Sequence, residues 1–269
     1  MRERIAVIHS HPSWLGLTEK WLYTIIKNLP ESIDSHIVCN ETRNESQFPL
    51  PNVHSLRENS KFSYTINKVL SQYGIRRYPS LLAEVAAEYG AQILHSHYGP
   101  MGWNNLAAAK KLGIVHIVNF YGYDIGYLPS SDKHWIDKYT QMFEEADLVL
   151  CEGSHMAESI EKLGCKKEKI RVQRIGIDTD EIKFSPRAWD SKEPLRVMIA
   201  GTFKEKKGIP YAVEALGLIK GRINFEATII GDAAADPSSI AEKNKILAAI
   251  ERNSLRIIFG LSDSCRTMK

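Results

Sequence analysis

The sequence lacks a large excess of charge of either sign and contains few cysteines. Its 269 residues include 35 lysines and arginines and 32 aspartates and glutamates, so the net charge is 35 − 32 = +3. A nucleic-acid partner is not expected, because such a partner favours a strongly basic surface. The sequence has no CxxC pair, so neither a zinc knuckle nor a disulfide framework is predicted. We expect free thiols in a reducing cytoplasm at Cys39, Cys151, Cys165 and Cys265.

Long apolar runs are also missing. The first stretch, "MRERIAVIHSHPSW", has an apolar core of four residues before His9, whereas a signal peptide needs about 7 to 15. No run approaches the roughly 18 apolar residues of a membrane span. A cytoplasmic location is therefore expected, and a peripheral contact with the inner face of the membrane is left open.

Short apolar strands alternate with helical patterns along most of the chain. This alternation predicts a doubly wound α/β sheet in residues 1–183. The expected strands are 4–10, 36–40, 92–97, 114–120 and 146–151, and the expected helices include 18–29, 80–90, 104–113 and 154–164.

A polar, proline-containing stretch, residues 184–194, has the composition of an interdomain linker. The rhythm of strand and helix then resumes from Leu195. Only 75 residues lie between Leu195 and Lys269, which is close to the size, about 70 to 80 residues, below which a single core is marginal. We therefore expect an incomplete second α/β domain in residues 195–269.

Ligands of open α/β sheets bind beyond the carboxyl ends of the strands, so the segments that follow the strands are the candidate sites. After the first strand, Gly16 could let the loop pass close to a ligand. The alternative is an ordinary loop in which Thr18 or Glu19 completes the first turn of the next helix.

Two histidines lie on the same side of a later strand end. His95 and His97 are two residues apart in "LHSHYGPMG", and strand side chains alternate between the two faces. No third ligand with a suitable spacing follows, so a metal site is not expected. Structural histidines, or one contact between His97 and a polar substrate, are the preferred interpretations.

The segment "NFYGYDIGYLP" combines aromatic rings, glycines and the carboxylate of Asp124. Aromatic faces and a carboxylate suit a polyhydroxylated ligand such as a sugar. The alternative is an Asx-type turn at Asp124, with tyrosines that fill a groove. The next strand end carries Glu152, and Ser154 is expected to cap the following helix.

The segment "AGTFKEKKGIPYAVEAL", residues 200–216, places a glycine and three lysines between a strand and a helix. The start of a helix offers free amides and a positive dipole end, so a phosphate site is plausible here. A solvated basic loop is the alternative. The sequence contains neither a P-loop nor a GxGxxG motif.

Three segments together resemble the family-four retaining glycosyltransferases of GT-B architecture, within the branch that builds bacterial exopolysaccharide, such as colanic acid. They are "HSHYGPMGWNNLAAAKKLGIVHIVNFYGYDIG", "ADLVLCEGSHMAESIEKLGCKKEKIRVQRIGIDTDEIKF" and "MIAGTFKEKKGIPYAVEAL". The resemblance implies two Rossmann-like domains: residues 1–183 for the acceptor and 195–269 for a nucleotide-sugar donor. It also implies that Lys207 holds the donor diphosphate, which Gly208 and the following helix cap.

The strand ends and the resemblance together predict the site. The function that the resemblance implies is transfer of a hexose from a nucleotide-diphosphate sugar to a lipid-linked or oligosaccharide acceptor, without a metal or other cofactor. Asp124 and Tyr121 are the candidate catalytic residues. The donor-binding candidates are Gly201, Thr202, Lys206, Lys207 and Gly208, and the acceptor-binding candidates are Gly16, Thr18, Glu19, His97, Gly122 and Glu152.

The chain departs from the family pattern at three points. Thr202 stands where an arginine is common, and Tyr121 stands where many relatives have a histidine. The pair of glutamates seven residues apart that grips the donor has no counterpart after Leu195. The alternative hypothesis is therefore a non-catalytic truncated remnant or accessory subunit of such a transferase. If the protein is instead an active transferase, a second chain could complete its second domain.

Overall fold

The computed structural model describes residues 4–72, 80–180, 182–186, 188–190 and 192–260. The chain divides into two compact units, residues 1–183 and 184–269, and each unit is described by itself. No helix among the described residues has both the length and the apolar character needed to cross a bilayer.

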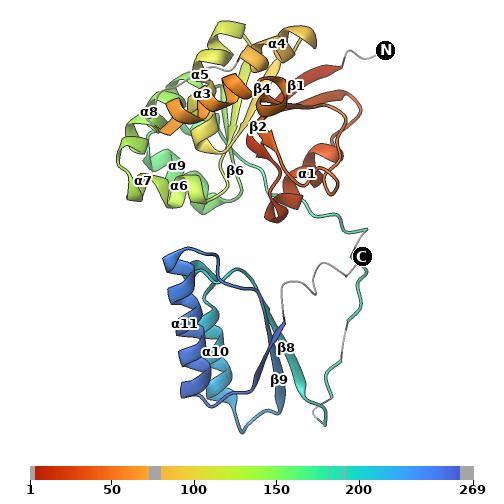
Figure 1. Ribbon diagram of the computed structural model, residues 1–269, viewed down its shortest axis with the longest axis vertical. Helices are drawn as coiled ribbons and strands as arrows, with labels where there is room; N and C mark the ends of the chain where they lie inside the picture. Colours follow the sequence, from red (N-terminus) through yellow and green to blue (C-terminus); the bar gives the residue numbers. More distant parts are fainter. Residues whose placement is uncertain (1–3, 73–79, 181, 187, 191, 261–269) are drawn as a thin grey trace. The chain divides into compact units, whose positions relative to one another are not determined.

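The first unit contains a seven-stranded, all-parallel sheet in the order β3-β2-β1-β4-β5-β6-β7 (Figure 1). Strands β1 and β4 are neighbours at the centre of the sheet. The strands that follow β1 are added on one side of this pair, and those that follow β4 are added on the other side. The predicted α/β fold with a parallel sheet is thus confirmed. The strands are β1 (Ile5–Trp14), β2 (Ile33–Thr42), β3 (Val53–Ser55), β4 (Ile93–His97), β5 (Val115–Asn119), β6 (Leu148–Cys151) and β7 (Ile170–Val172).

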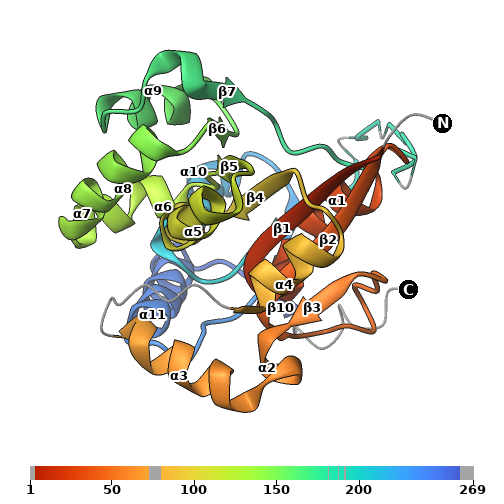
Figure 2. The same cartoon turned by 90° about the horizontal axis from the view of Figure 1, so that it is seen from above.

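Helices cover both faces of this sheet (Figure 2). On one face, α4 and α5 bury Ile8 and Leu94 of the central strands. On the other face, α1 packs Leu22 and Ile26 against Ile37 of β2. The helical segments are η1 (Leu17–Glu19), α1 (Lys20–Lys27), α2 (Leu56–Asn59), α3 (Lys61–Gln72), α4 (Ser80–Glu88), α5 (Gly99–Leu112), α6 (Tyr123–Gly126), α7 (Leu128–Ser131), α8 (His134–Glu145), α9 (Ser154–Lys162) and η2 (Lys167–Lys169).

Helix α5 lies unusually close to its neighbours because two glycines face them. A Cβ atom on Gly102 would lie 2.5 Å from Cγ1 of Val118 on β5, and one on Gly99 would lie 2.6 Å from Cε1 of Phe120. Real Cβ atoms essentially never approach other atoms this closely. Because these two positions carry no side chain, the start of α5 can pack directly against Val118 of β5 and Phe120.

Some local expectations differ from the structure. Ser154 does not cap α9: the N-cap is Gly153, and Ser154 is the first helical residue. The first two strands each have ten residues and extend past the predicted ends. They pair with each other along their whole length, from Ile5 and Ile33 to Trp14 and Thr42.

The second unit is a parallel three-stranded sheet in the order β10-β9-β8, built from β8 (Leu195–Ala200), β9 (Phe225–Ile230) and β10 (Ile257–Gly260). The helical segments η3 (Glu205–Lys207), α10 (Ile209–Ile219) and α11 (Pro237–Arg252) connect the strands. Both long helices lie on one face of the sheet (Figure 1). Val213 and Ile246 pack there against Ile229, whereas Met198 and Ile258 are exposed.

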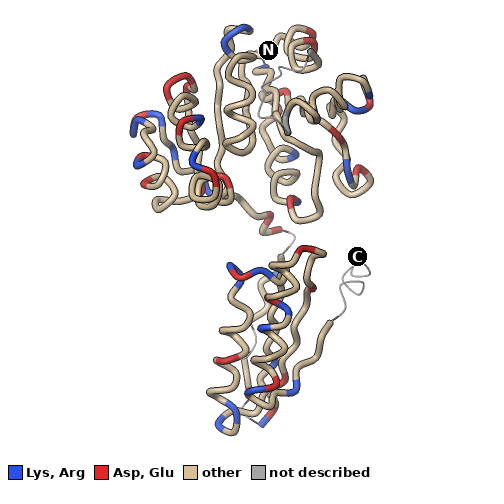
Figure 3. Tube along the Cα trace, turned by 60° about the vertical axis from the view of Figure 1, so that its left-hand side comes forward, with Lys and Arg blue, Asp and Glu red and all other residues tan. Residues whose placement is uncertain are grey.

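Charged residues of both signs are interspersed on each unit (Figure 3). This distribution agrees with the small net charge of +3. No surface dominated by positive or negative charge marks a binding site among the described residues, so the candidate sites are identified from local geometry.

Candidate active site

The first candidate site lies at the carboxyl ends of β1 and β4, where the strand order of the first unit reverses. Such a reversal opens a crevice in doubly wound sheets, because the connections on its two sides run in opposite directions. The loop after β1, the start of α5 and the loop after β5 all lie at this edge.

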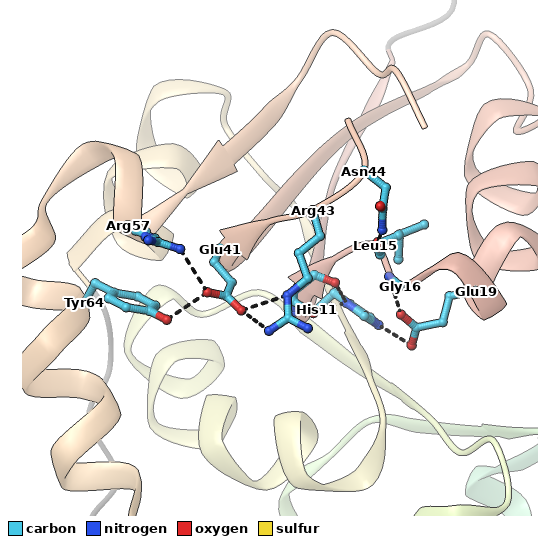
Figure 4. Close-up of polar contacts among 10 residues, drawn as sticks. His11, Leu15, Gly16, Glu19, Glu41, Arg43, Asn44, Arg57 and Tyr64 are labelled. Atoms are coloured by element: carbon cyan, nitrogen blue, oxygen red, sulfur yellow. Dashed lines mark hydrogen bonds and ion pairs between the residues drawn. The ribbon is translucent and has the colours of Figure 1, made fainter. Parts of the chain in front are cut away.

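Glu19 organises the loop after β1 (Figure 4). Its Oε2 accepts a hydrogen bond from the amide of Gly16 at 2.9 Å, and its Oε1 accepts one from the Tyr98 hydroxyl at 2.8 Å and lies 3.5 Å from Nε2 of His11. Burial alone would raise the pKa of Glu19, but the hydrogen bond and charge of His11 and the bonds from Tyr98 and Gly16 outweigh it and lower the pKa to about 2.

This geometry favours the interpretation in which Glu19 completes the first turn. Gly16 has an ordinary φ of −72°, and a Cβ atom there would lie 3.0 Å from Oε2 of Glu19. The close approach at Gly16 is thus made by Glu19 of the same chain. Thr18 lies between them on η1 and is exposed.

A second carboxylate network follows β2 and was not predicted from the sequence (Figure 4). Glu41 pairs with Arg43 through both Nε and a terminal nitrogen of the guanidinium. It also accepts a hydrogen bond from the Tyr64 hydroxyl at 2.8 Å and lies 3.5 Å from Arg57. This network connects the end of β2 to α2 and α3, and both arginines remain exposed.

Aromatic rings gather around Tyr121 at the end of β5. The Tyr121 ring lies 4.5 Å from Trp21 of α1 and 4.9 Å, edge-on, from Tyr98. Its hydroxyl lies 2.6 Å from Nδ1 of His97. Burial raises the pKa of Tyr121 well above its usual value, so the phenol keeps its proton at neutral pH.

Asp124 is fully buried and holds the loop after β5. Its Oδ1 accepts hydrogen bonds from the amides of Tyr121 and Gly122, and its Oδ2 accepts one from Gly99, each at 3.0 Å. The carboxylate thus reaches back toward earlier residues, so the Asx-type turn given above as the alternative is not formed. Burial raises its pKa and outweighs these amide hydrogen bonds, which lower it.

Gly122 is required by the backbone of this loop. Its φ is +107°, a conformation that side-chain-bearing residues rarely adopt.

Because Asp124 has no exposed surface, its predicted contact with a substrate is not favoured by this geometry. The arrangement points instead to Asp124 as a positioning residue for Tyr121 and Gly122.

Glu152 follows β6 at the same edge of the sheet and is partly exposed. Burial and then the nearby charge of Asp124 raise its pKa. A carboxyl group with a raised pKa at the carboxyl end of a parallel strand can exchange protons or accept hydroxyl hydrogen bonds from a ligand.

His97 is an interior residue and not a surface contact. It is 1% exposed, and its ring nitrogens lie 2.6 Å from the Tyr121 hydroxyl and 3.2 Å from Nδ1 of His9. The predicted direct contact with an acceptor is therefore corrected, because the neighbouring rings enclose the imidazole.

The expectation that no third ligand accompanies His95 and His97 is also wrong. Because β1 and β4 are paired, His9 lies level with His95. The three histidines each offer one nitrogen, and these atoms all lie within 4.8 Å of one another. Spacing along one strand could not reveal this cluster, because its third member comes from a neighbouring strand 86 residues earlier in the chain than His95.

The second candidate site is the loop between β8 and α10 in the other unit. Gly208 has φ +63° and forms the N-cap of α10, and Lys207 lies back over Gly201, with Cγ and Cδ 3.8 Å from where a Cβ on Gly201 would be. Thr202, Lys206 and Lys207 are exposed. Since Pro210 has no N–H and Ala212 donates to the Gly208 carbonyl, the start of α10 offers the amides of Ile209 and Tyr211 to an anion.

Gly231, which the sequence did not single out, shapes the same loop. It follows β9 with φ +144°, and a Cβ atom there would lie 2.0 Å from the carbonyl oxygen of Gly201. Two glycines from neighbouring strand ends thus touch each other, which leaves open backbone beside Lys207.

Comparison with known proteins relates the chain to sugar transferases. Residues 18–181 match the family model described as Glycosyltransferase Family 4. One relative is WcaL of Escherichia coli K12, which is named as a colanic acid biosynthesis glycosyltransferase. It is 31% identical over 157 residues, which are 56% of this chain and 38% of WcaL. The amylovoran biosynthesis glycosyltransferase AmsK of Erwinia amylovora is 31% identical over 173 residues, 63% of this chain and 42% of that protein.

Solved structures share the fold. Anabaena HepE in complex with UDP and glucose has a TM-score of 0.69 and 16% identity, over 96% of this chain and 69% of that one. The lipopolysaccharide outer core galactosyltransferase WaaB has a TM-score of 0.63 and 18% identity, over 98% and 69%. The matched segments span only 38% and 42% of the sequence relatives above. Because the family model covers residues 18–181 of the 269, the chain belongs to glycosyltransferase family 4, and it has the α/β architecture of the GT-B structures.

Proposed function

We propose that the protein transfers a hexose from a nucleotide-diphosphate sugar to a lipid-linked or oligosaccharide acceptor in the synthesis of exopolysaccharide or another cell-surface polysaccharide. Membership of glycosyltransferase family 4 supports the reaction class. The names of WcaL and AmsK support the polysaccharide context. The UDP and glucose bound to HepE support a nucleotide-sugar donor.

The observation that carries the donor assignment is the loop between β8 and α10. Lys207 lies over Gly201, and the contact between Gly201 and Gly231 keeps side chains away from this backbone. A diphosphate at this position would meet the Lys207 ammonium and the amides of Ile209 and Tyr211. Thr202 and Lys206 border the same loop, and Gly208 supplies the left-handed turn into α10.

The acceptor assignment rests on the edge of the first unit's sheet. The partly exposed Glu152 and the aromatic ring of Tyr121 offer a carboxylate and a flat apolar face, a combination that suits a sugar. Gly16, Thr18, Glu19 and Gly122 form the bordering loops. Asp124 and His97 act through Tyr121, because both are buried beneath it.

In the proposed reaction, the bond between the anomeric carbon and the diphosphate oxygen breaks, and a bond from that carbon to the acceptor oxygen forms on the same face. The acceptor hydroxyl gives its proton to the departing diphosphate, so atoms and charge balance. The chief task of the protein is to stabilise negative charge on the leaving group, which Lys207 and the α10 amides do without moving. Retention of configuration is carried over from the family resemblance.

Calorimetric titration of the 269-residue chain with UDP, GDP and ADP tests the donor half of this proposal. We expect one nucleotide to bind near the micromolar level, about 8 kcal/mol. Lys207→Ala should weaken that binding about 10- to 100-fold, because it removes one charge-assisted contact of about 1.5–3 kcal/mol. Arg222→Ala is the matched control, since this exposed cation lies before β9, at the opposite end of the strands.

Equal weakening by the two substitutions would show a non-specific charge effect and contradict the assignment of Lys207. A folded chain that binds no nucleotide would favour the alternative, a non-catalytic remnant or accessory subunit of such a transferase. Incubation of the binding nucleotide's glucose and galactose derivatives with lipid extracts, followed by mass spectrometry, then tests transfer itself.

A further inference from the structure

Three imidazoles from two neighbouring strands converge at the point where the strand order reverses. His9 of β1 pairs in register with His95 of β4, and His97 lies two residues further along the same face. Since Ile8 and Leu94 point toward α4 and α5, the three histidines occupy the opposite face of the sheet. The His9 and His97 rings are stacked 5.4 Å apart, and those of His95 and His97 lie 4.3 Å apart.

We propose that His9, His95 and His97 form a binding site for a divalent metal ion of the zinc class. Their ligand nitrogens all lie within 4.8 Å of one another. Nδ1 of His9 and Nε2 of His97 are 3.2 Å apart, close to the roughly 3.3 Å that separates two nitrogens bound to one tetrahedral ion at about 2.0–2.1 Å. Rotation of the His95 ring would bring the third nitrogen into the same sphere.

The hydrogen bonds of the cluster do not give every ring nitrogen a partner. Nε2 of His9 and Nε2 of His95 are buried and have no hydrogen-bond partner within the described parts of the chain. A buried polar atom without a partner destabilises the folded protein. A metal ion bound by Nδ1 of His9 and Nε2 of His97 would also use the unpartnered Nε2 of His95.

The surroundings of the cluster match those of metal-binding histidines. Such ligands usually hydrogen-bond through their second nitrogen, which fixes the ring. Nδ1 of His97 lies 2.6 Å from the Tyr121 hydroxyl, and Asn119 hydrogen-bonds to His95. His95 is partly exposed as a residue, whereas its free Nε2 atom is buried.

The protonation of the cluster agrees with metal binding. Burial lowers the pKa of His95 to about 4 and lowers the pKa of His9 and His97 well below the usual value. The rings are therefore neutral at pH 7, and neutral imidazole is the form that binds metals. The ion would connect β1 to β4 beneath the acceptor site, and its role would be structural.

The test is a titration of the tag-free, EDTA-stripped full-length chain with Co²⁺ and Zn²⁺ at pH 7. Cobalt in a four-coordinate site absorbs visible light strongly, so absorption reports the geometry, and calorimetry reports stoichiometry. We expect one ion per chain, loss of the cobalt absorption on Zn²⁺ addition, and a higher melting temperature with Zn²⁺. His95→Ala should weaken binding at least about 100-fold, and Tyr121→Phe about 10-fold, because the latter leaves all three ligands but removes the bond to His97.

The matched control is His54→Asn, which removes an imidazole from a separate ring cluster with His36 and Tyr89 and should leave Co²⁺ binding unchanged. If His95→Ala fails to fold, the wild-type stoichiometry, absorption and melting shift still decide the question. A folded wild-type chain that shows no four-coordinate cobalt spectrum would overturn the proposal. The same holds if His54→Asn abolishes binding while His95→Ala preserves it.

Discussion

Tyr98 donates a hydrogen bond to Glu19 across 79 residues of sequence, with 2.8 Å between the two oxygens. Tyr98 also precedes α5 with φ +74°, a conformation that costs a residue with a side chain about 1–3 kcal/mol. The contact with Glu19 and the bond from the Tyr98 amide to the Asn119 carbonyl hold this strained residue in place. The strained residue, Tyr98, therefore contacts both the loop after β1 and the end of β5, and both border the candidate acceptor site.

Glu19 should make the protein less stable in acid. Its pKa is lowered from 4.5 to about 2 in the folded state, so the stabilisation is fully present above pH 4.5 and is lost as the pH falls toward 2. Glu19→Gln removes this pH dependence, and it should cost on the order of 2 kcal/mol at pH 7 and little near pH 2. Urea unfolding at a series of pH values measures both.

The control for this prediction is Glu158→Gln, which changes an exposed glutamate of α9. Its unfolding curve should follow wild type at every pH. If Glu19→Gln lowered the free energy of unfolding equally at pH 2 and pH 7, the negative charge of Glu19 would not be the source of its stabilising effect.

Gly102→Ala should destabilise the first unit by about 1–3 kcal/mol, because the new methyl group overlaps Val118 and the sulfur of Met142. Gly126→Ala is the matched control, since a Cβ there meets nothing within 4 Å. That substitution should be neutral or slightly stabilising. Chemical denaturation distinguishes the two, and similar stabilities would show that α5 can move away from β5 at no cost.

Asp124→Asn should cost about 2–4 kcal/mol. The amide group of asparagine can replace only one carboxylate oxygen as an acceptor, so either Gly99 or the pair Tyr121 and Gly122 would face an NH₂ group. Asp137→Asn, an exposed position on α8, should change the unfolding free energy by less than about 0.5 kcal/mol. A small effect of Asp124→Asn on folding together with a large loss of transfer activity would instead restore a direct catalytic role for Asp124.

Gly231→Ala should disrupt the loop that contains Lys207. The new Cβ would overlap the Gly201 carbonyl, and φ is +144°. Gly221→Ala is a demanding control, because Gly221 also has a positive φ, +81°, but no atom within 4 Å of its Cβ. Both variants should lose about 1 kcal/mol to backbone strain, and only Gly231→Ala should also lose binding of the nucleotide that the titration identifies. Equal nucleotide binding by the two variants would argue against an anion site at this loop.

The central strands were predictable because they are short apolar runs buried on both faces, such as the segment around Ile8. The strands β3 and β7 have three residues each, too few for a periodic pattern. The Glu41 network and the third histidine were missed for another reason. The histidine cluster depends on the pairing of β1 with β4, and the Glu41 network depends on the packing of α2 and α3 beside the end of β2. Both are tertiary properties that local spacing does not encode.

The lysine-containing loop is the intermediate case. A glycine, three lysines and a helix start were visible in the sequence, whereas the contribution of Gly231 depends on the pairing of β8 with β9. The N-cap of α9 was also predicted wrongly: glycine and serine are both acceptable N-cap residues, and the structure has Gly153 at this position.

The central position of β1 has a consequence during synthesis. This strand is synthesised well before one of its two partners, β4, which ends at His97. At about 5–20 residues per second, the segment between them takes on the order of 5–20 s to translate. Throughout that interval the backbone N–H and C=O groups along the β4 side of β1 have no strand to pair with. We therefore expect the centre of the sheet to form only after β4 has been synthesised.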